Sequence, residues 1–235
     1  MSARSDAASG STFGEVLDLL LPQRCLVCSL PGDHVCGGCR SGLRWIAPPL
    51  CERCGAPTAW PVRRCAECTG RRLAFARARA AVEYDEPVRQ IVAAWKERGL
   101  RRLAEWAAEI VVETVTRPDV SCLAYVPGDP DRRLKRGHHA AERLARALGE
   151  AWELPVEPLL TRSGRSPRQR GLSQAERRRN VAGAFCPAGR VPARVVLVDD
   201  VYTTGATANA AASALRKGGA RRVEVVTFAR TIRLR

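Results

Sequence analysis

The chain has 235 residues, enough for one packed domain and a small additional module. Its hydrophobic fraction of 46% is ordinary for a globular protein and excludes wholesale disorder. The formal net charge of +15 favours polyanionic ligands such as phosphorylated metabolites or nucleic acid, although arginine-rich compositions also yield basic proteins without such ligands. Residues 1–12 are small and polar, and we expect a flexible tail there.

The sequence contains no recognisable targeting signal or membrane-spanning run. The apolar stretch at residues 15–21 is short and includes Glu15 and Asp18, whereas a spanning helix needs about 20 apolar residues. We therefore expect a short helix at this stretch, no membrane insertion and a cytoplasmic location.

Eight of the ten cysteines form four Cys-x-x-Cys pairs within residues 24–69. In a cytoplasmic chain such pairs predict metal ligands before disulfides, because two thiolates on a tight turn can reach one tetrahedral ion at about 2.3 Å. Four pairs predict two structural Zn²⁺ ions with four ligands each. The predicted ligands are Cys25, Cys28, Cys36, Cys39, Cys51, Cys54, Cys65 and Cys68.

The pairing of these cysteines stays open from sequence alone. The pairs can share ions sequentially, interleaved, or outer with inner, and we favour the sequential arrangement. Iron–sulfur clusters, disulfides and thioredoxin-like redox chemistry are the alternatives to zinc. Cys122 and Cys186 stand outside the pairs and are expected to be ordinary buried thiols. The tryptophans, Trp60 included, are expected to pack in the core or the ribbons.

Beyond residue 73 the chain alternates predicted strands and helices, which indicates an α/β fold with a doubly wound, mostly parallel sheet. Helical spacing of apolar residues and glycine stops predict helices at 86–98, 101–116, 140–152 and 206–217. Apolar runs predict strands at 76–84, 122–126, 156–160, 195–198 and 223–228. The expected organisation is a tail at 1–12, a double zinc-ribbon module at 13–72 and the α/β domain at 73–235.

The run 195–207 carries the chemical signal. A buried strand leads into Asp199 and Asp200, a turn of hydroxyl residues and glycine follows, and a helix then begins. In parallel α/β sheets ligands bind at the carboxyl ends of the strands, and a helix start offers free N–H groups to a phosphate. Phosphate-loop and dinucleotide-binding glycine motifs are absent from the sequence. The predicted phosphate-binding residues are Thr203, Thr204, Gly205, Ala206 and Thr207.

The two carboxylates would repel a phosphate unless they bind another part of the same ligand. Vicinal ribose hydroxyls donate strongly to carboxylates, and a nearby Mg²⁺ would offset the negative charge. A phosphate on one side and hydroxyls with a metal on the other describe a 5-phosphoribosyl ligand. In the alternative interpretation, Asp199 and Asp200 only cap the helix and the Thr-Thr-Gly run is a simple turn.

The run 195–207 resembles the 5-phosphoribosyl diphosphate (PRPP) signature of type I phosphoribosyltransferases, and with the cysteine pairs before it the chain resembles the ComF family. The resemblance implies that Asp199 and Asp200 contact the ribose hydroxyls and the metal, and that residues 203–207 hold the 5-phosphate. It also implies a pyrophosphate-binding segment and a mobile hood loop. The residues of this chain that match those segments, with the lysine of a Lys-x-x-Gly element, are Lys96, Arg132, Arg133, Arg136, Arg162, Arg168, Gln169 and Arg177.

The chain departs from the family pattern after the predicted strand at 122–126. It reads Pro-Gly-Asp-Pro at 127–130 where the family has Pro-x-Pro, and Arg-Gly-His-His-Ala at 136–140 where the family has Arg-Gly-Phe-Asn-Gln. These changes bear on turnover more than on PRPP binding. His138 and His139 are interpreted as residues of a helix start, with a metal or base role as the alternative.

Two functional classes follow from these observations. One is a PRPP-binding protein that transfers a phosphoribosyl group and releases pyrophosphate, with Mg²⁺ bound alongside PRPP and a link to DNA uptake that the family name implies; no catalytic side chain is singled out. The other is a non-catalytic factor in DNA uptake. It would bind single-stranded DNA or DNA-uptake proteins through its basic ribbons, with PRPP as a regulator or a relic.

Overall fold

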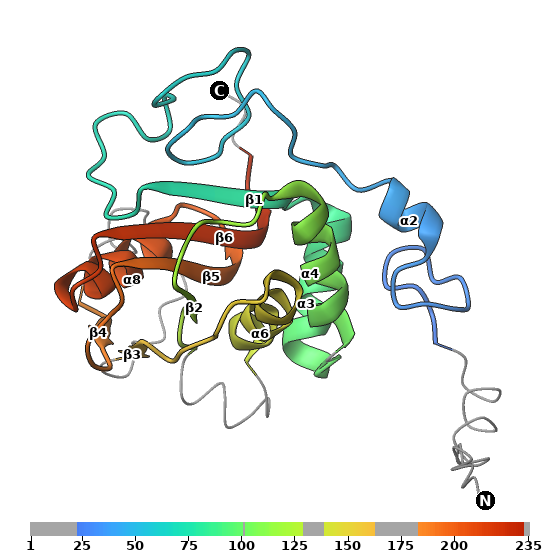
Figure 1. Cartoon of the computed structure of the whole chain (residues 1–235). Coiled ribbons are helices and arrows are strands. Elements are labelled where there is room, and N and C mark those ends of the chain that lie inside the picture. The colour runs from blue at the N-terminus through green and yellow to red at the C-terminus, as the bar shows by residue number, and fades with distance from the viewer. Residues whose placement is uncertain (1–22, 101, 129–138, 163–182, 233–235) are drawn as a thin grey trace, which may run out of the picture. The chain divides into compact units, whose positions relative to one another are not determined.

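The computed structural model describes residues 23–100, 102–128, 139–162 and 183–232 (Figure 1). The chain divides into two compact units, Met1–Gly42 and Leu43–Arg235. The smaller unit contains the first four paired cysteines and a short helix, α2 (Gly37–Ser41). The helix expected at residues 15–21 lies outside the described residues.

The larger unit is built on a four-stranded, fully parallel sheet in the order β1-β6-β5-β2. A separate antiparallel pair joins β3 to β4. The strands are β1 (Arg77–Glu83), β2 (Cys122–Tyr125), β3 (Leu160–Arg162), β4 (Phe185–Pro187), β5 (Arg194–Tyr202) and β6 (Arg222–Arg230). The helices are α3 (Glu86–Arg98), α4 (Arg102–Thr114), α6 (Ala140–Trp152) and α8 (Ala206–Lys217).

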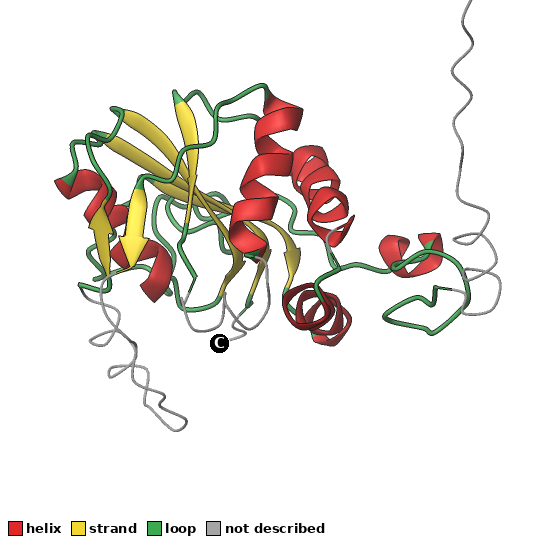
Figure 2. Cartoon of the chain, turned by 90° about the horizontal axis from the view of Figure 1, so that it is seen from below, coloured by secondary structure: helices red, strands yellow, loops and turns green. Residues whose placement is uncertain are grey.

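Helices cover both faces of the parallel sheet, as Figures 1 and 2 show: α3, α4 and α6 lie on one side and α8 lies on the other. On the first side Phe228 of β6 contacts Trp95 of α3 and Trp106 of α4 edge to face, with ring centroids 6.4 and 5.7 Å apart. Because strand side chains alternate, the neighbouring positions of β6 face α8. The predicted doubly wound α/β fold class is therefore confirmed.

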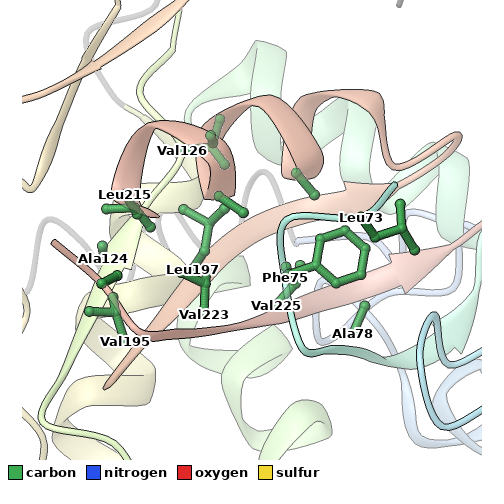
Figure 3. Packing of buried hydrophobic residues seen from close by; sticks show 14 of the residues in the cluster. Leu73, Phe75, Ala78, Ala124, Val126, Val195, Leu197, Leu215, Val223 and Val225 are labelled. Atoms are coloured by element: carbon green, nitrogen blue, oxygen red, sulfur yellow. The ribbon is translucent and has the colours of Figure 1, made fainter. Parts of the chain in front are cut away.

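The core on the α8 side is continuous from the sheet to the second group of cysteines. Figure 3 shows Val195 and Leu197 of β5 beside Val223 and Val225 of β6, with Phe75 next to them. The same buried cluster includes three of the predicted zinc ligands, Cys51, Cys54 and Cys68. The second ribbon thus belongs to the core of the α/β unit, because its own apolar residues are too few to form one.

Most predicted elements match the structure, and one strand was wrong. Helices α3, α6 and α8 have the expected bounds. The strand predicted at 156–160 is instead β3, Leu160–Arg162, and Val156 forms only a single bridge with Leu123. Strand β4 was not expected from the sequence, since a three-residue strand leaves no measurable period.

None of the helices among the described residues is long and apolar enough to cross a membrane.

Candidate functional site

The predicted ligand-binding acids lie within β5, because this strand ends at Tyr202, four residues beyond its expected end at Val198. Asp199 pairs with Thr227 of β6, and the pairing continues to Tyr202, which lies opposite Arg230. The strand reaches Tyr202 because β6 offers it a partner over its whole length. Asp199 and Asp200 therefore occupy the carboxyl half of a central parallel strand, where ligands of α/β folds bind.

Lys96, in the last turn of α3, forms an ion pair with the second of these acids. Its Nζ lies 2.6 Å from Oδ2 of Asp200, whose side chain is only 12% exposed. Burial by itself lowers the pKa of Lys96, but the Asp200 carboxylate leaves that pKa above its ordinary value. The structure thus brings the lysine of the expected Lys-x-x-Gly element to the two acids.

Within the described residues, the ion pair of Lys96 is made with Asp200 and not with Asp199. One carboxylate oxygen of Asp199 accepts the backbone N–H of Asp200 at 2.9 Å. Desolvation, followed by repulsion from Asp200, raises the pKa of Asp199 to about 7, although Lys96 opposes this shift. An acid held near its neutral form at physiological pH fits a site that is completed by a bound cation or by hydroxyl donors.

The loop after β5 presents a helix start, as the sequence predicts. Gly205 is the N-cap of α8 in the left-handed conformation, with φ 70°, and a methyl group at this position would lie 2.2 Å from the Tyr202 hydroxyl. Thr204 Oγ1 accepts the N–H of Ala206 at 3.2 Å. The first amides of α8 have no intrahelical acceptor, and the helix dipole adds partial positive charge there.

The alternative in which the two acids only cap the helix is wrong. The N-cap of α8 is Gly205, and Asp199 and Asp200 lie in the preceding strand, where they cap no helix. Two acids in a strand and the start of α8 remain, separated by residues 201–204. This pair of opposite electrostatic features is what a ligand with both hydroxyls and a phosphate requires.

Another predicted ligand contact, Arg162, lies in the separate antiparallel sheet of β3 and β4. It is the last residue of β3, and its guanidinium lies 5.6 Å from the centre of the Phe185 ring. The remaining pyrophosphate and hood-loop candidates lie outside the described residues, and so does His138; these candidates are Arg132, Arg133, Arg136, Arg168, Gln169 and Arg177.

His139 has a structural explanation, as a residue of a helix start. Its Nδ1 accepts the backbone N–H of Glu142 at 3.2 Å and so caps α6. The imidazole also lies against Gly128, where a methyl group would come within 2.4 Å of the ring. The Gly128 and His139 departures from the family pattern therefore contact each other.

The cysteines group sequentially, as favoured from the sequence. The sulfur atoms of Cys25, Cys28, Cys36 and Cys39 lie within 4.8 Å of one another, and so do those of Cys51, Cys54, Cys65 and Cys68. Four sulfurs at about 2.3 Å from one tetrahedral ion would lie about 3.8 Å apart. The observed Cys51–Cys68 and Cys54–Cys65 separations are 3.6 and 3.4 Å. The two clusters therefore fit two structural zinc sites.

Backbone amides support the thiolate form of one cysteine in each cluster. In the second cluster the Cys65 N–H donates to Sγ of Cys51 at 3.3 Å. Burial raises the pKa of Cys51, yet the N–H groups of Cys54 and Cys65 outweigh it and lower that pKa to about 7. Cys25 in the first cluster has its pKa lowered to about 6 by the same balance. Thiolates are the form that binds zinc.

Two expectations about isolated side chains were wrong in part. Cys122 is buried as expected, but Cys186 is exposed because β4 is a short strand at the surface. Trp95 and Trp152 are core residues, whereas Trp60 in the second ribbon is 68% exposed. The ribbon is too small to enclose an indole on all sides, so Trp60 faces solvent.

The comparisons with known proteins agree with the two parts of the chain. A family model described as a double zinc ribbon domain matches residues 16–69. Competence protein F of Haemophilus influenzae is 28% identical over 223 residues, which span 88% of this chain and 96% of that protein. The chain is similar to this competence protein along nearly its whole length. DNA utilization protein YhgH of Salmonella typhimurium is 29% identical over 91% of this chain and 100% of its own. Competence protein ComFC of Bacillus subtilis is 28% identical over 88% of this chain and 89% of its own.

Two solved structures are similar to part of this chain. A glutamine PRPP amidotransferase from B. subtilis in complex with ADP and GMP matches 54% of this chain and 25% of its own, with 23% identity and a TM-score of 0.36. The protein TT1426 from Thermus thermophilus matches 54% of this chain and 72% of its own, with 23% identity and a TM-score of 0.30. At these scores neither likeness identifies a ligand or an activity.

Proposed function

We propose that the α/β unit binds PRPP with Mg²⁺ at the carboxyl end of β5. The observation that carries the proposal is the juxtaposition of two acids in the strand, Asp199 and Asp200, with the free helix start at Gly205. The acids suit vicinal ribose hydroxyls, and the helix start suits the 5-phosphate. The donor set also fits a divalent cation, because carboxylate oxygens are ligands that Mg²⁺ prefers and the ion pair of Lys96 engages Asp200 rather than Asp199.

The reaction of such a site would be displacement at the anomeric carbon of PRPP. Residues 203–207 hold the 5-phosphate, Asp199 and Asp200 accept hydrogen bonds from the ribose hydroxyls, and the ion pair with Lys96 holds Asp200 in place. Bound Mg²⁺ would offset the charge of the departing pyrophosphate. These roles are positioning and charge stabilisation, which dominate phosphoribosyl chemistry without a protein nucleophile. We place the protein in the cytoplasm, where reduced cysteines persist.

Calorimetric titration of PRPP with Mg²⁺ into the zinc-loaded protein tests the proposal. The wild type should bind saturably, and the variant Asp199→Asn/Asp200→Asn should lose the signal. Asp119→Asn is the matched control, because Asp119 pairs with Arg194 at the amino end of β5, is 84% exposed, and should leave binding unchanged. A folded wild type that does not bind PRPP would remove the proposal.

A second candidate function, contact with single-stranded DNA, is favoured by Trp60. This indole is 68% exposed on the second ribbon, and the nearby Arg63 and Arg64 are exposed as well. Aromatic faces stack on bases of any sequence while arginines contact phosphates. The names of the relatives, competence and DNA utilization proteins, place those proteins in the same context.

The test is fluorescence anisotropy of a labelled single-stranded oligonucleotide at about 50 mM and 200 mM salt. Trp60→Ala should weaken binding about tenfold. The control Val112→Ala removes another exposed apolar side chain, on α4, and should have no effect. Equal affinity of the Trp60 variant and the wild type would exclude a stacking role for this residue.

A further inference from the structure

The second ribbon contacts the phosphate-binding loop directly through Arg71. This arginine follows the last ligand of the second cluster by three residues, and its Nη2 donates to the backbone carbonyl of Thr204 at 2.8 Å. On the ribbon side, Arg64 donates to the carbonyl of Arg71 at 3.0 Å. Arg71 is half-buried, so the bond to the loop is partly shielded from water.

A second connection runs beneath the loop, through Tyr202 and Arg230. Arg230 is 1% exposed and donates to the carbonyl of Cys54 at 2.5 Å and to the carboxylate of Glu67 at 3.0 Å. Its guanidinium also lies 5.2 Å from the centre of the Tyr202 ring. The Tyr202 hydroxyl in turn fills the space beside Gly205. Ribbon, arginine, tyrosine and loop therefore form one chain of buried contacts.

A third connection joins the segment after the ribbon to the helix that follows the loop. The backbone N–H of Ala74 donates to Oδ1 of Asn209 in α8 at 2.7 Å. Phe75 contacts Tyr202 edge to face, with ring centroids 6.3 Å apart, and lies against β6 in the core shown in Figure 3. The loop is thus held at three places: by the bond from Arg71, by the contact of Arg230 with Tyr202, and by the bond from the Ala74 amide to α8.

The hydrogen bond from Arg71 also affects the backbone N–H of Gly205, one of the expected phosphate donors. The Thr204 carbonyl belongs to the same peptide group as the N–H of Gly205. A cationic donor on that carbonyl polarises the peptide and makes the N–H a stronger donor. In addition, it fixes the peptide plane, which would otherwise be free to turn in a bend of small residues.

We propose that Arg71 is a positioning residue for the phosphate-binding loop, and that metal at the second cysteine cluster and a phosphate ligand at the loop stabilise each other. The proposal rests on the proposed PRPP site. Loss of metal would release the turn Cys65–Cys68, and with it Arg71 and Glu67, from their places. Because coupling between the affinities of two binding sites is reciprocal, a ligand at the loop must then raise the affinity of the second cluster for the metal.

The first experiment measures PRPP affinity by calorimetry in full-length, zinc-loaded variants. Arg71→Ala should weaken binding about tenfold at unchanged zinc content, and Arg71→Lys, which keeps one cationic donor, should recover most of the loss. Arg63→Ala is the control, because Arg63 is an exposed arginine of the same ribbon. Equal affinity of Arg71→Ala and the wild type would overturn the positioning role.

The second experiment measures the equilibrium affinity for zinc by competition with a chromophoric chelator, with and without PRPP and Mg²⁺. A Cys25→Ser/Cys28→Ser background removes the first cluster, so that the competition reports on the second alone. PRPP should raise the zinc affinity at least about fivefold, and Arg71→Ala should abolish most of that gain. A zinc affinity that saturating PRPP does not change would overturn the coupling.

The third experiment separates this inference from the proposed function. Amide hydrogen exchange of residues 203–209 is measured in the absence of any ligand. Arg71→Ala should speed exchange about fivefold or more relative to Arg63→Ala, because the loop has lost its external donor. Unchanged exchange would overturn the positioning role even if PRPP binds, whereas faster exchange would support it even if PRPP does not.

Discussion

Lys96 Nζ and Asp200 Oδ2 lie 2.6 Å apart, joining the last turn of α3 to the carboxyl half of β5. The two residues are 104 positions apart in the chain and come from different layers of the fold. The pair is partly enclosed, with Lys96 34% exposed and Asp200 12% exposed, so water screens it less than a surface ion pair. Asp200 lies next to Asp199 in the chain, and its carboxylate helps to raise the pKa of Asp199, which disfavours the charged form of that acid.

Lys96→Met should destabilise the protein by about 1–3 kcal/mol at pH 7.5, because Asp200 would be left buried beside Asp199 without its cation. Urea unfolding measures the change. Arg89→Ala removes the cation of the exposed pair with Glu86 on the same helix and should cost less than about 0.5 kcal/mol. In the double variant Lys96→Met/Asp200→Asn most of the loss should disappear, and a full, additive loss would show that Lys96 acts by packing alone.

Asp199→Asn should stabilise the folded protein at alkaline pH while weakening PRPP binding. Since the folded-state pKa of Asp199 is raised to about 7, the folded protein holds this proton more tightly than the unfolded chain does. The acid therefore costs stability progressively as pH rises from about 4 to about 7. We expect a gain of roughly 1–3 kcal/mol for the asparagine variant at pH 8 that shrinks at pH 5.

Thermal unfolding of Asp199→Asn, Asp119→Asn and the wild type at both pH values measures this difference. Asp119 is exposed, and its variant should follow the wild type. A stability gain for Asp199→Asn that is the same at pH 5 and pH 8 would rule out charge as its cause.

Gly205→Ala should both destabilise the protein and abolish ligand binding. The new methyl group would meet the Tyr202 hydroxyl, in a residue whose φ of 70° an alanine adopts only with strain. Gly70→Ala is the matched control, since Gly70 has φ 73° but open space around its Cα. The control should lose only about 1 kcal/mol from backbone strain, and Gly205→Ala should lose clearly more in the same urea titration.

The two cysteine clusters should contribute unequally to the stability of the α/β unit. Cys51 is fully buried in the core on the α8 side, so Cys51→Ser should lower the free energy of unfolding by more than about 3 kcal/mol. Cys25→Ser affects a cluster in the smaller unit and should leave the unfolding of the α/β unit nearly unchanged. Tryptophan fluorescence reports on that unit, because Trp95 and Trp106 pack on Phe228. Equal losses in the two variants would contradict this division.

The local motifs predicted their own geometry well. The Cys-x-x-Cys pairs sit on tight turns that bring four sulfurs together, and the run after β5 forms a helix start around a left-handed glycine. These features depend on a few neighbouring residues, and short-range backbone chemistry determines them. No comparable signal predicts the three-residue strands or the exposure of Trp60, because neither is encoded by a hydrophobic period or a residue spacing.

The sequence by itself determined the α/β class, the eight cysteine ligands and the order of acids, loop and helix at the proposed site, since periodicity and local spacing encode all three. Only the tertiary structure decided that the clusters form sequentially, that Lys96 pairs with Asp200, and that Arg71 and Arg230 fasten the second ribbon to the loop. Each of those contacts joins residues brought together by folding. Their partners are set by how strands, helices and ribbon pack, which no single segment encodes.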